Sequence, residues 1–164
     1  MKSTDPRRTE NRRQIFFHSR RIDQYHCFTN CTPHPVTYNG KVYPTSEHLF
    51  QAFKFMDSRP DIAEGIRTVS KSRMKAFEYS MAHIEHQDLD WNRMRIAKLE
   101  ITTWHKFSQH PELRLKLLGT GDAELVVQPY MYHRTLPETT SGDKKGRNEF
   151  GKALERVRTS LRDT

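Results

Sequence analysis

The sequence predicts an α+β fold, a single helix-rich domain with a small β-sheet. The chain has 164 residues, which is the size of one domain with its own core. Several long segments repeat apolar residues at the 3.6-residue period of a helix. Asn39-Gly40 separates two short runs of β-prone residues, which is the strongest short-range signal for a hairpin. Nine Phe, six Tyr and two Trp argue against a disordered chain, although the charge content is high.

The first half of the chain contains the predicted strands. Residues 1–14 hold five basic side chains against two acidic ones, so we interpret them as a basic flexible N-terminal arm before a domain at 15–164. The apolar run Ile15-Phe16-Phe17 predicts a strand, and residues 36–38 and 41–43 form the two sides of the hairpin. A helix follows Pro44, with Thr45 or Ser46 as its N-cap.

Helices dominate the second half. Leu125-Val126-Val127 predicts a buried strand, and residues 129–147 contain two prolines and two glycines and predict a long loop. The expected helices cover residues 60–68, 71–82, 89–108 and 111–118, and a last one begins near Asn148.

Composition limits the class of protein. The net charge of +8 favours an anionic partner, such as nucleic acid, a phosphorylated metabolite or an acidic surface. No stretch approaches the roughly 20 apolar residues that span a bilayer, so no membrane partner is expected. The polar N-terminus lacks the apolar core of a secretory signal, and the two cysteines are expected to stay reduced. We expect an intracellular, cytoplasmic protein, with a nuclear role for the basic arm left open.

Residues 43–55 contain the most informative side chains. At about 100° per residue, Glu47, Gln51 and Lys54 fall on one stripe of a short helix. Spacing alone favours an ordinary solvated face. The alternative is a chemical site, because Lys54 lies between two phenylalanines and a desolvated lysine loses part of its preference for the charged form. A neutral amine is a nucleophile.

Other clusters carry weaker signals. His26, Cys27, Cys31 and His34 resemble zinc ligands, but the C-x3-C spacing and the adjacent His26 and Cys27 favour a packed or partly exposed cysteine pair. We therefore expect no metal and no cofactor. Trp91, near a helix start, is a candidate to stack on a planar ligand.

The basic run from Asp143 to Asn148 lies just before a helix. It is either an anion site or a solvated loop, and the sequence leaves both readings open.

Together these residues resemble the NADAR or YbiA-like family, a name linked to NAD and ADP-ribose chemistry. The resemblance runs in order from about residue 15 to residue 162. Its most specific part is Y-P-T-S-E-H-L-F-Q-A-F-K-F at 43–55, close to the family's P-T-S-E-H-x-F-Q-x-x-K-F. The other matches are I-F-F at 15–17, Y-H-C-F-T-N at 25–30, Trp91, K-F-S-Q-H at 106–110, L-L-x-T-G at 117–121, L-V at 125–126 and G-R-N-x-F-G-x-A-L-x-x-V-R at 146–158.

The chain departs from the family pattern in two places. After Leu125-Val126 the family has V-E and then D-x-x-W-G, whereas this chain reads V-Q-P-Y-M-Y-H-R-T-L-P-E. The family's small Gly-Arg segment before the tryptophan is absent near residues 77–83.

The resemblance implies hydrolysis of the bond between ribose C1 and a base nitrogen. It implies catalytic roles for Glu47, as an electrostatic or acid/base group, and for Lys54, as a Schiff-base nucleophile. Substrate-binding residues implied in the same way are Asn30, His48, Gln51, Trp91, Arg147 and Asn148.

The expected partner is ADP-ribosylated guanine in a nucleotide or nucleic acid, with no obligate protein partner. Two alternatives stay open. One is an N-glycosidase that acts on phosphoribosylamino-pyrimidine intermediates of riboflavin biosynthesis. The other is a non-catalytic module that binds ADP-ribose or nucleic acid.

Overall fold

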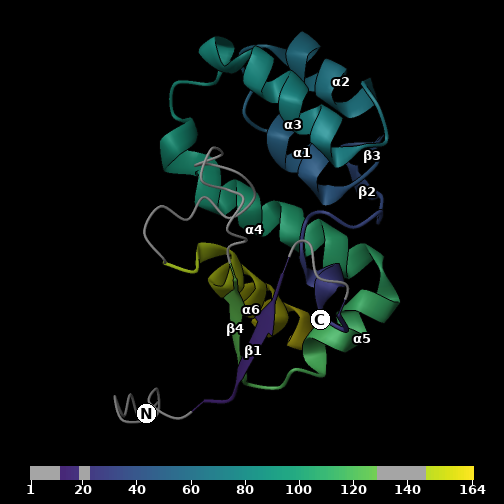
Figure 1. Ribbon diagram of the computed structural model, residues 1–164, viewed down its shortest axis with the longest axis vertical. Helices are drawn as coiled ribbons and strands as arrows, with labels where there is room; N and C mark the ends of the chain where they lie inside the picture. Colours follow the sequence, from purple (N-terminus) through teal and green to yellow (C-terminus); the bar gives the residue numbers. More distant parts are fainter. Residues whose placement is uncertain (1–11, 19–22, 129–146) are drawn as a thin grey trace.

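Helices make up most of the computed structural model, which describes residues 12–18, 23–128 and 147–164 (Figure 1). Residues 1–11 of the expected arm at 1–14 and residues 129–146 of the expected loop at 129–147 lie outside the described residues. The last residue of the expected arm, Gln14, is the first residue of β1. The elements are β1 (Gln14–Phe17), η2 (His26–Phe28), β2 (Val36–Tyr38), β3 (Lys41–Tyr43), α1 (Ser46–Ala52), α2 (Pro60–Thr68), α3 (Arg73–Ala82), η3 (Ile84–His86), α4 (Trp91–Gln109), α5 (Pro111–Leu118), β4 (Glu124–Val127) and α6 (Glu149–Arg162).

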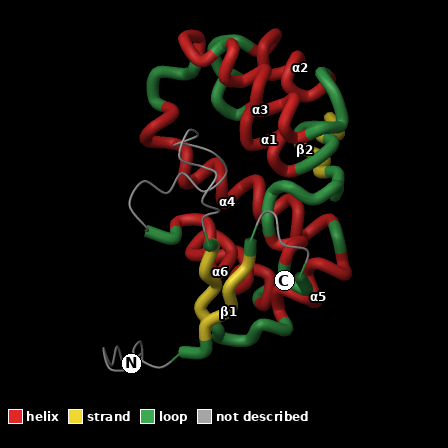
Figure 2. Tube along the Cα trace, viewed as in Figure 1, coloured by secondary structure: helices red, strands yellow, loops and turns green. Residues whose placement is uncertain are grey.

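The expected small sheet is present as two separate two-stranded sheets in the described residues (Figure 2). β2 and β3 form the predicted antiparallel hairpin, and Asn39 and Gly40 have the positive φ angles, 47° and 75°, that a tight hairpin turn needs. β1 pairs in parallel with β4, with Ile15 opposite Leu125. A parallel pair needs a long crossover, and here the crossover contains the first five α-helices.

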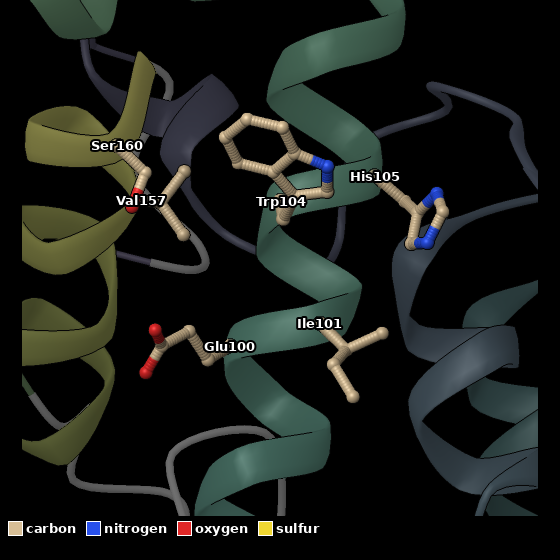
Figure 3. A pocket seen from close by; sticks show the side chains of 6 residues that line it. All are labelled: Glu100, Ile101, Trp104, His105, Val157 and Ser160. Carbon is tan, nitrogen blue, oxygen red and sulfur yellow. The ribbon is translucent and has the colours of Figure 1, made fainter. Parts of the chain in front are cut away.

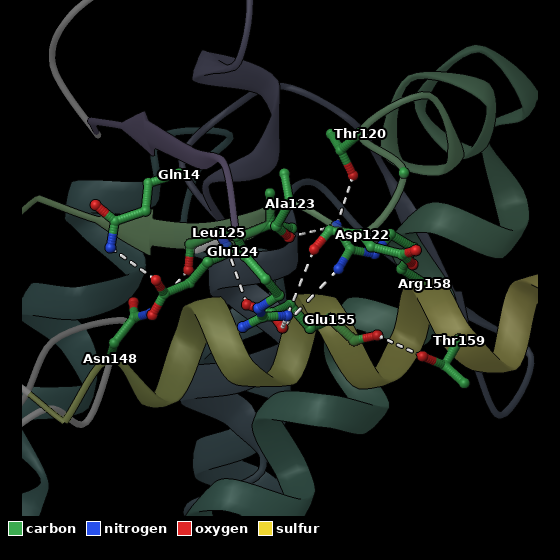
Figure 4. A network of polar contacts seen from close by, with 12 residues as sticks. Gln14, Thr120, Asp122, Ala123, Glu124, Leu125, Asn148, Glu155, Arg158 and Thr159 are labelled. Atoms are coloured by element: carbon green, nitrogen blue, oxygen red, sulfur yellow. Dashed lines mark hydrogen bonds and ion pairs between the residues drawn. The ribbon is translucent and has the colours of Figure 1, made fainter. Parts of the chain in front are cut away.

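Side-chain amides complete the exposed edges of both sheets. Asn148 donates from Nδ2 to the Leu125 carbonyl (2.7 Å) and accepts at Oδ1 from the Val127 N–H (3.1 Å) (Figure 4). Gln109 makes the same pair of hydrogen bonds with Thr37. Its Nε2 donates to the Thr37 carbonyl and its Oε1 accepts from the Thr37 N–H, both at 2.7 Å. Each amide therefore takes the place of a neighbouring strand and satisfies backbone groups at an edge.

The long helix α4 runs across the middle of the molecule (Figure 1). The hairpin and α1 to α3 lie on one side of it, and the β1–β4 sheet, α5 and α6 lie on the other. A single cluster of buried apolar side chains extends through both parts. The rings of Phe17, Phe28 and Phe107 pack edge to face within it, with centroids 5.6–5.9 Å apart.

The predicted helix boundaries are confirmed within about two residues. Helices α2 and α5 span the predicted residues, and each has proline in its first turn, where the missing N–H costs nothing. The largest difference is at α1, which ends at Ala52, so Lys54 is not part of the helix. Its N–H donates to the Gln51 carbonyl at 3.2 Å, in a tightened turn.

Asp88 holds the turn that follows α1 and Lys54. Its carboxylate accepts from the N–H groups of Asp57 (3.4 Å) and Ser58 (3.1 Å) and from the Ser58 hydroxyl. These donors lie beyond the end of α1, so a distant residue satisfies the backbone of the turn.

The helices that the structure describes include none with the length and apolar character to cross a membrane.

Candidate functional site

The stripe on α1 is inside the protein. The side chains of Glu47 and Lys54 belong to residues that are each 2% exposed, and Gln51 is fully buried. The prediction from spacing alone, that these residues form a solvated face, is therefore wrong. Helix α1 packs against α2, α3 and α4, and every residue of the helix is buried.

Glu47 and Gln51 form a hydrogen-bonded pair. Together with Asn30, Lys54 and Trp91, they form what we call the buried polar cluster. Gln51 donates from Nε2 to Glu47 Oε1 at 2.7 Å. Its own Oε1 is buried and has no hydrogen-bond partner among the described residues. A buried amide oxygen without a partner costs free energy, so it is the kind of group that a bound ligand satisfies.

Lys54 lies beside the start of α4. Its Nζ is 5.9 Å from the centroid of the Trp91 ring, and its carbonyl accepts from the Asp88 N–H at 2.8 Å. The Trp91 N–H in turn donates to the Asp88 carbonyl at 3.0 Å. A short chain of backbone hydrogen bonds therefore holds the lysine and the tryptophan together, although 37 positions separate them in the sequence.

Asn30 reaches the same cluster from the segment after η2. Its carbonyl accepts from the Glu47 N–H at 3.2 Å, at the first turn of α1. Its side chain is almost fully buried, and Nδ2 has no hydrogen-bond partner in the described part of the chain. Asn30 thus presents an unused donor near the carboxylate-bearing residue.

His48 is held inside the protein by both ring nitrogens. Nδ1 lies 2.8 Å from the Thr45 hydroxyl and Nε2 lies 2.8 Å from the Ser70 carbonyl. A carbonyl only accepts, so Nε2 carries the proton. Burial lowers the pKa of His48 below its ordinary 6.5, so the ring is neutral at pH 7. In this structure His48 fixes the N-terminus of α1, and its role in substrate binding stays a prediction.

Trp91 is buried, at 5% exposure, and packs against Phe50 with ring centroids 5.3 Å apart. It therefore forms part of the wall around Lys54. Its stacking on a base stays a prediction.

Arg147 and Asn148 lie at the N-terminus of α6. Asn148 has a left-handed backbone, with φ of 53°, and its side chain is hydrogen-bonded to the backbone of β4. Arg147 is exposed. Phosphate binding by either residue stays a prediction.

The cysteines do not form a metal site with the nearby histidines. No group of three or more potential metal ligands occurs in the described residues, and both cysteines are free and half-buried. Burial, with a contribution from the Glu47 charge, raises the pKa of Cys31 to about 11. The thiol therefore stays protonated and is a poor nucleophile.

Three further residues belong to the surroundings of the proposed site, and no role was assigned to any of them from the sequence, although Lys106 begins the family match at 106–110. Asp88 holds the turn after Lys54. The charge of half-buried Arg73 offsets part of the rise in the pKa of Cys31. Lys106 is fully buried on α4. A signal for Lys106 exists in the sequence, since it shares a helix face with Leu99, Thr102 and Thr103.

A groove of about 400 Å³ lies elsewhere, between α4 and α6 (Figure 3). Ile101, Trp104 and Val157 supply its apolar lining, and Glu100 at its rim pairs with Arg156 at 2.6 Å. None of the predicted site residues lines it.

Comparison with known proteins identifies the family. The sequence model of the NADAR domain matches residues 16–162. The chain belongs to the NADAR family. The NADAR match covers Asn30, Glu47, Gln51, Lys54 and Trp91.

Relatives of this NADAR protein include enzymes. It is 34% identical over 139 residues to the N-glycosidase YbiA of Shigella sonnei, covering 85% of this chain and 83% of that protein. It is also 34% identical over 142 residues to a riboflavin biosynthesis protein of Vibrio vulnificus, covering 86% of this chain but only 37% of the relative. The NMR structure of YbiA from E. coli superposes with a TM-score of 0.75 at 30% identity, over 92% of this chain and 87% of that one.

Proposed function

We propose that this protein is an N-glycosyl hydrolase that cleaves the ribose C1–N bond and releases ADP-ribose from guanine bases or nucleotides. The observation that carries the proposal is that Glu47 and Lys54 are buried together, next to two amide atoms, Gln51 Oε1 and Asn30 Nδ2, that lack hydrogen-bond partners among the described residues. Buried ionisable groups are costly, and proteins keep them mainly where chemistry needs them. The similarity to N-glycosidases supports the reaction class.

The chemistry follows from what each group offers. When the C1–N bond breaks, the base leaves with the bonding electron pair and takes up a proton, and C1 becomes electron-poor. The Glu47 carboxylate stabilises that positive charge. Water adds to C1 and gives up a proton, which completes the cleavage and leaves ribose. The ribose ring then opens to its C1 aldehyde, and the Lys54 amine, once it has lost its proton, adds there and expels water to form an imine. Water then hydrolyses the imine, which restores the amine and frees the sugar.

The remaining predicted residues are assigned to binding. The Asn30 and Gln51 amides orient ribose hydroxyl groups, and Trp91 contacts the base. Arg147 and Asn148 bind phosphate at the start of α6. The net charge of +8 favours a nucleotide or nucleic-acid substrate over a small neutral one.

The direct test is hydrolysis of ADP-ribosylated guanosine, followed as release of guanosine. We expect Glu47→Gln to lower turnover by about 10²- to 10⁴-fold, the usual contribution of an acid/base group. Lys54→Ala should lose turnover, and borohydride should trap a sugar adduct on wild-type Lys54 but not on Lys54→Arg. Full activity in Lys54→Ala would remove the nucleophile role and leave Glu47 as the main catalytic group.

Matched control variants come from α3. Lys75 and Glu78 form an exposed ion pair at 2.9 Å, so Lys75→Ala and Glu78→Gln remove the same chemical groups outside the site. Both should keep wild-type turnover.

The second candidate is the riboflavin-pathway N-glycosidase, favoured by the name of the Vibrio vulnificus relative. It would release the pyrimidine from a phosphoribosylamino-pyrimidine with the same groups. Turnover of that substrate but not of ADP-ribosylated guanosine would replace our proposal with this one. Tight binding of ADP-ribose without turnover of either substrate, unaffected by Lys54→Ala, would indicate a binding module instead.

A further inference from the structure

Lys106 is a fully buried lysine that the proposed chemistry does not use. Its Nζ donates to the carbonyls of Cys27 and Thr29, both at 2.6 Å, and to the Thr32 hydroxyl at 2.9 Å. Each N–H of the ammonium thus has its own acceptor, and all three acceptors lie on one short segment. This pattern holds a loop in place across a gap of more than 70 residues in the sequence.

The segment from Cys27 to Thr32 contains Asn30. The Thr29 carbonyl, which Lys106 holds, belongs to the peptide group that joins Thr29 to Asn30. The Asn30 carbonyl accepts from the Glu47 N–H. Both peptide groups that flank Asn30 are therefore fixed, one by α4 and the other by α1. This leaves little freedom in the direction of the Asn30 side chain, whose Nδ2 is buried and lacks a hydrogen-bond partner among the described residues.

We propose that Lys106 is a positioning residue that acts through Asn30: by holding the 27–32 segment, it aims the Asn30 amide at a substrate hydroxyl beside Glu47. The choice of a ribose hydroxyl rests on the proposed function. The positioning itself rests only on the hydrogen bonds above. Groups placed within a few tenths of an ångström by such support bind and orient a substrate without further reorganisation.

Burial is consistent with this role. A buried ammonium is costly, and burial lowers the pKa of Lys106 to about 7, against opposing contributions from Cys27 and Cys31. A residue kept only for packing would be replaced by an apolar side chain at no such cost.

A double-mutant cycle tests the coupling. Lys106→Met keeps most of the apolar stem of the side chain and removes the three donors. It should raise KM for ADP-ribosylated guanosine about 10- to 100-fold in the wild-type background, the range expected when a binding group is misplaced. In the Asn30→Ala background the same change should raise KM less than about threefold, because there is no amide left to aim. Equal effects in both backgrounds would overturn the proposal.

Two further variants keep the test clear. Thr32→Val removes only one acceptor and should give a smaller rise in KM in a chain that folds normally. The matched control is Lys116, an exposed lysine on α5 that donates to the Gln24 carbonyl at 2.6 Å. Lys116→Met removes one lysine–carbonyl bond to the neighbouring segment and should leave KM unchanged.

Hydrogen exchange of the Glu47 amide separates this proposal from the proposed function. That amide donates to Asn30, so Lys106→Met should speed its exchange at least about tenfold, while Lys116→Met should not. If wild type cleaves no substrate, the proposed function falls and the exchange rate still decides the role of Lys106. Unchanged exchange at Glu47 in Lys106→Met would overturn the positioning role whatever the substrate.

Discussion

At the scale of single residues, burial decides what the chemistry of this protein can be. Glu47, Gln51 and Lys54 carry side chains that are common on wet helix faces, yet all three are inside the protein. The same holds for Lys106, which lies on the buried face of α4 together with Leu99 and two threonines. Buried polar groups of this kind reduce stability, so their presence together marks the part of the molecule that is shaped for binding rather than for folding.

Lys106 gives the protein a stability that depends on pH. Burial lowers its pKa from 10.5 to about 7, so between these values the unfolded chain binds a proton that the folded chain lacks. Stability therefore rises with pH above about 7, by up to about 1 kcal/mol per pH unit. The raised pKa of Cys31 lowers the stability of the folded protein as the pH rises above 9.

We expect the urea midpoint of wild type to rise from pH 7 to 9 and that of Lys106→Met to stay flat. Parallel profiles for the two proteins would contradict this.

At the scale of elements, the short helix α1 and the turn after it depend on distant partners. The helix has seven residues, too few to be stable alone, and its neighbours α2, α3 and α4 hold it. Asp88 then fixes the turn that carries Lys54 out of the helix. The position of Lys54 is thus set by the loop before α4 as much as by α1 itself.

Asp88→Asn tests this dependence. The asparagine lacks the charge and one of the two acceptor oxygens, so it should lower the free energy of unfolding by about 1–3 kcal/mol, measured with urea. Turnover should fall further than the folded fraction, because Lys54 is displaced. Asp90→Asn is the control, since Asp90 pairs with exposed Arg93 at 2.9 Å on the same loop. Loss of stability with normal turnover of the folded protein would show that Asp88 does not position Lys54.

At the scale of the whole molecule, α4 connects the two halves and one apolar core runs through both. The residues of the proposed site come from several elements. Asn30 lies in the segment before the hairpin, Glu47 and Lys54 lie in α1 and the turn after it, and Trp91 lies at the start of α4. The basic surface of the molecule, with a net charge of +8, is the feature that favours an anionic substrate.

The salt dependence of KM tests whether that substrate is nucleic acid. If the guanine lies in an oligonucleotide, phosphate contacts release counterions, and KM should rise steeply between about 50 and 200 mM salt. KM for ADP-ribosylated guanosine itself should change much less, and it serves as the control. The same shallow salt dependence for both substrates would argue for a nucleotide as the natural substrate.

Much of the fold follows from local signals in the sequence. The hairpin depends on the backbone freedom of Asn39 and Gly40, and the helices α2 and α5 begin at prolines. These preferences act within a few residues, so they can be read without a structure. The family resemblance, confirmed by the NADAR match, added the expectation of an N-glycosidase site at residues 43–55.

Tertiary structure alone decided the rest. Spacing favoured a wet face for Glu47, Gln51 and Lys54, because periodicity shows which residues share a side but not what covers that side. The turn after α1 is held by Asp88, and the segment around Asn30 is held by Lys106. Both are long-range hydrogen bonds between groups that no local pattern connects. The sequence determined which residues are proposed for the site. Packing decided that they are buried together, where the low dielectric constant strengthens the effect of a carboxylate and an amine on each other.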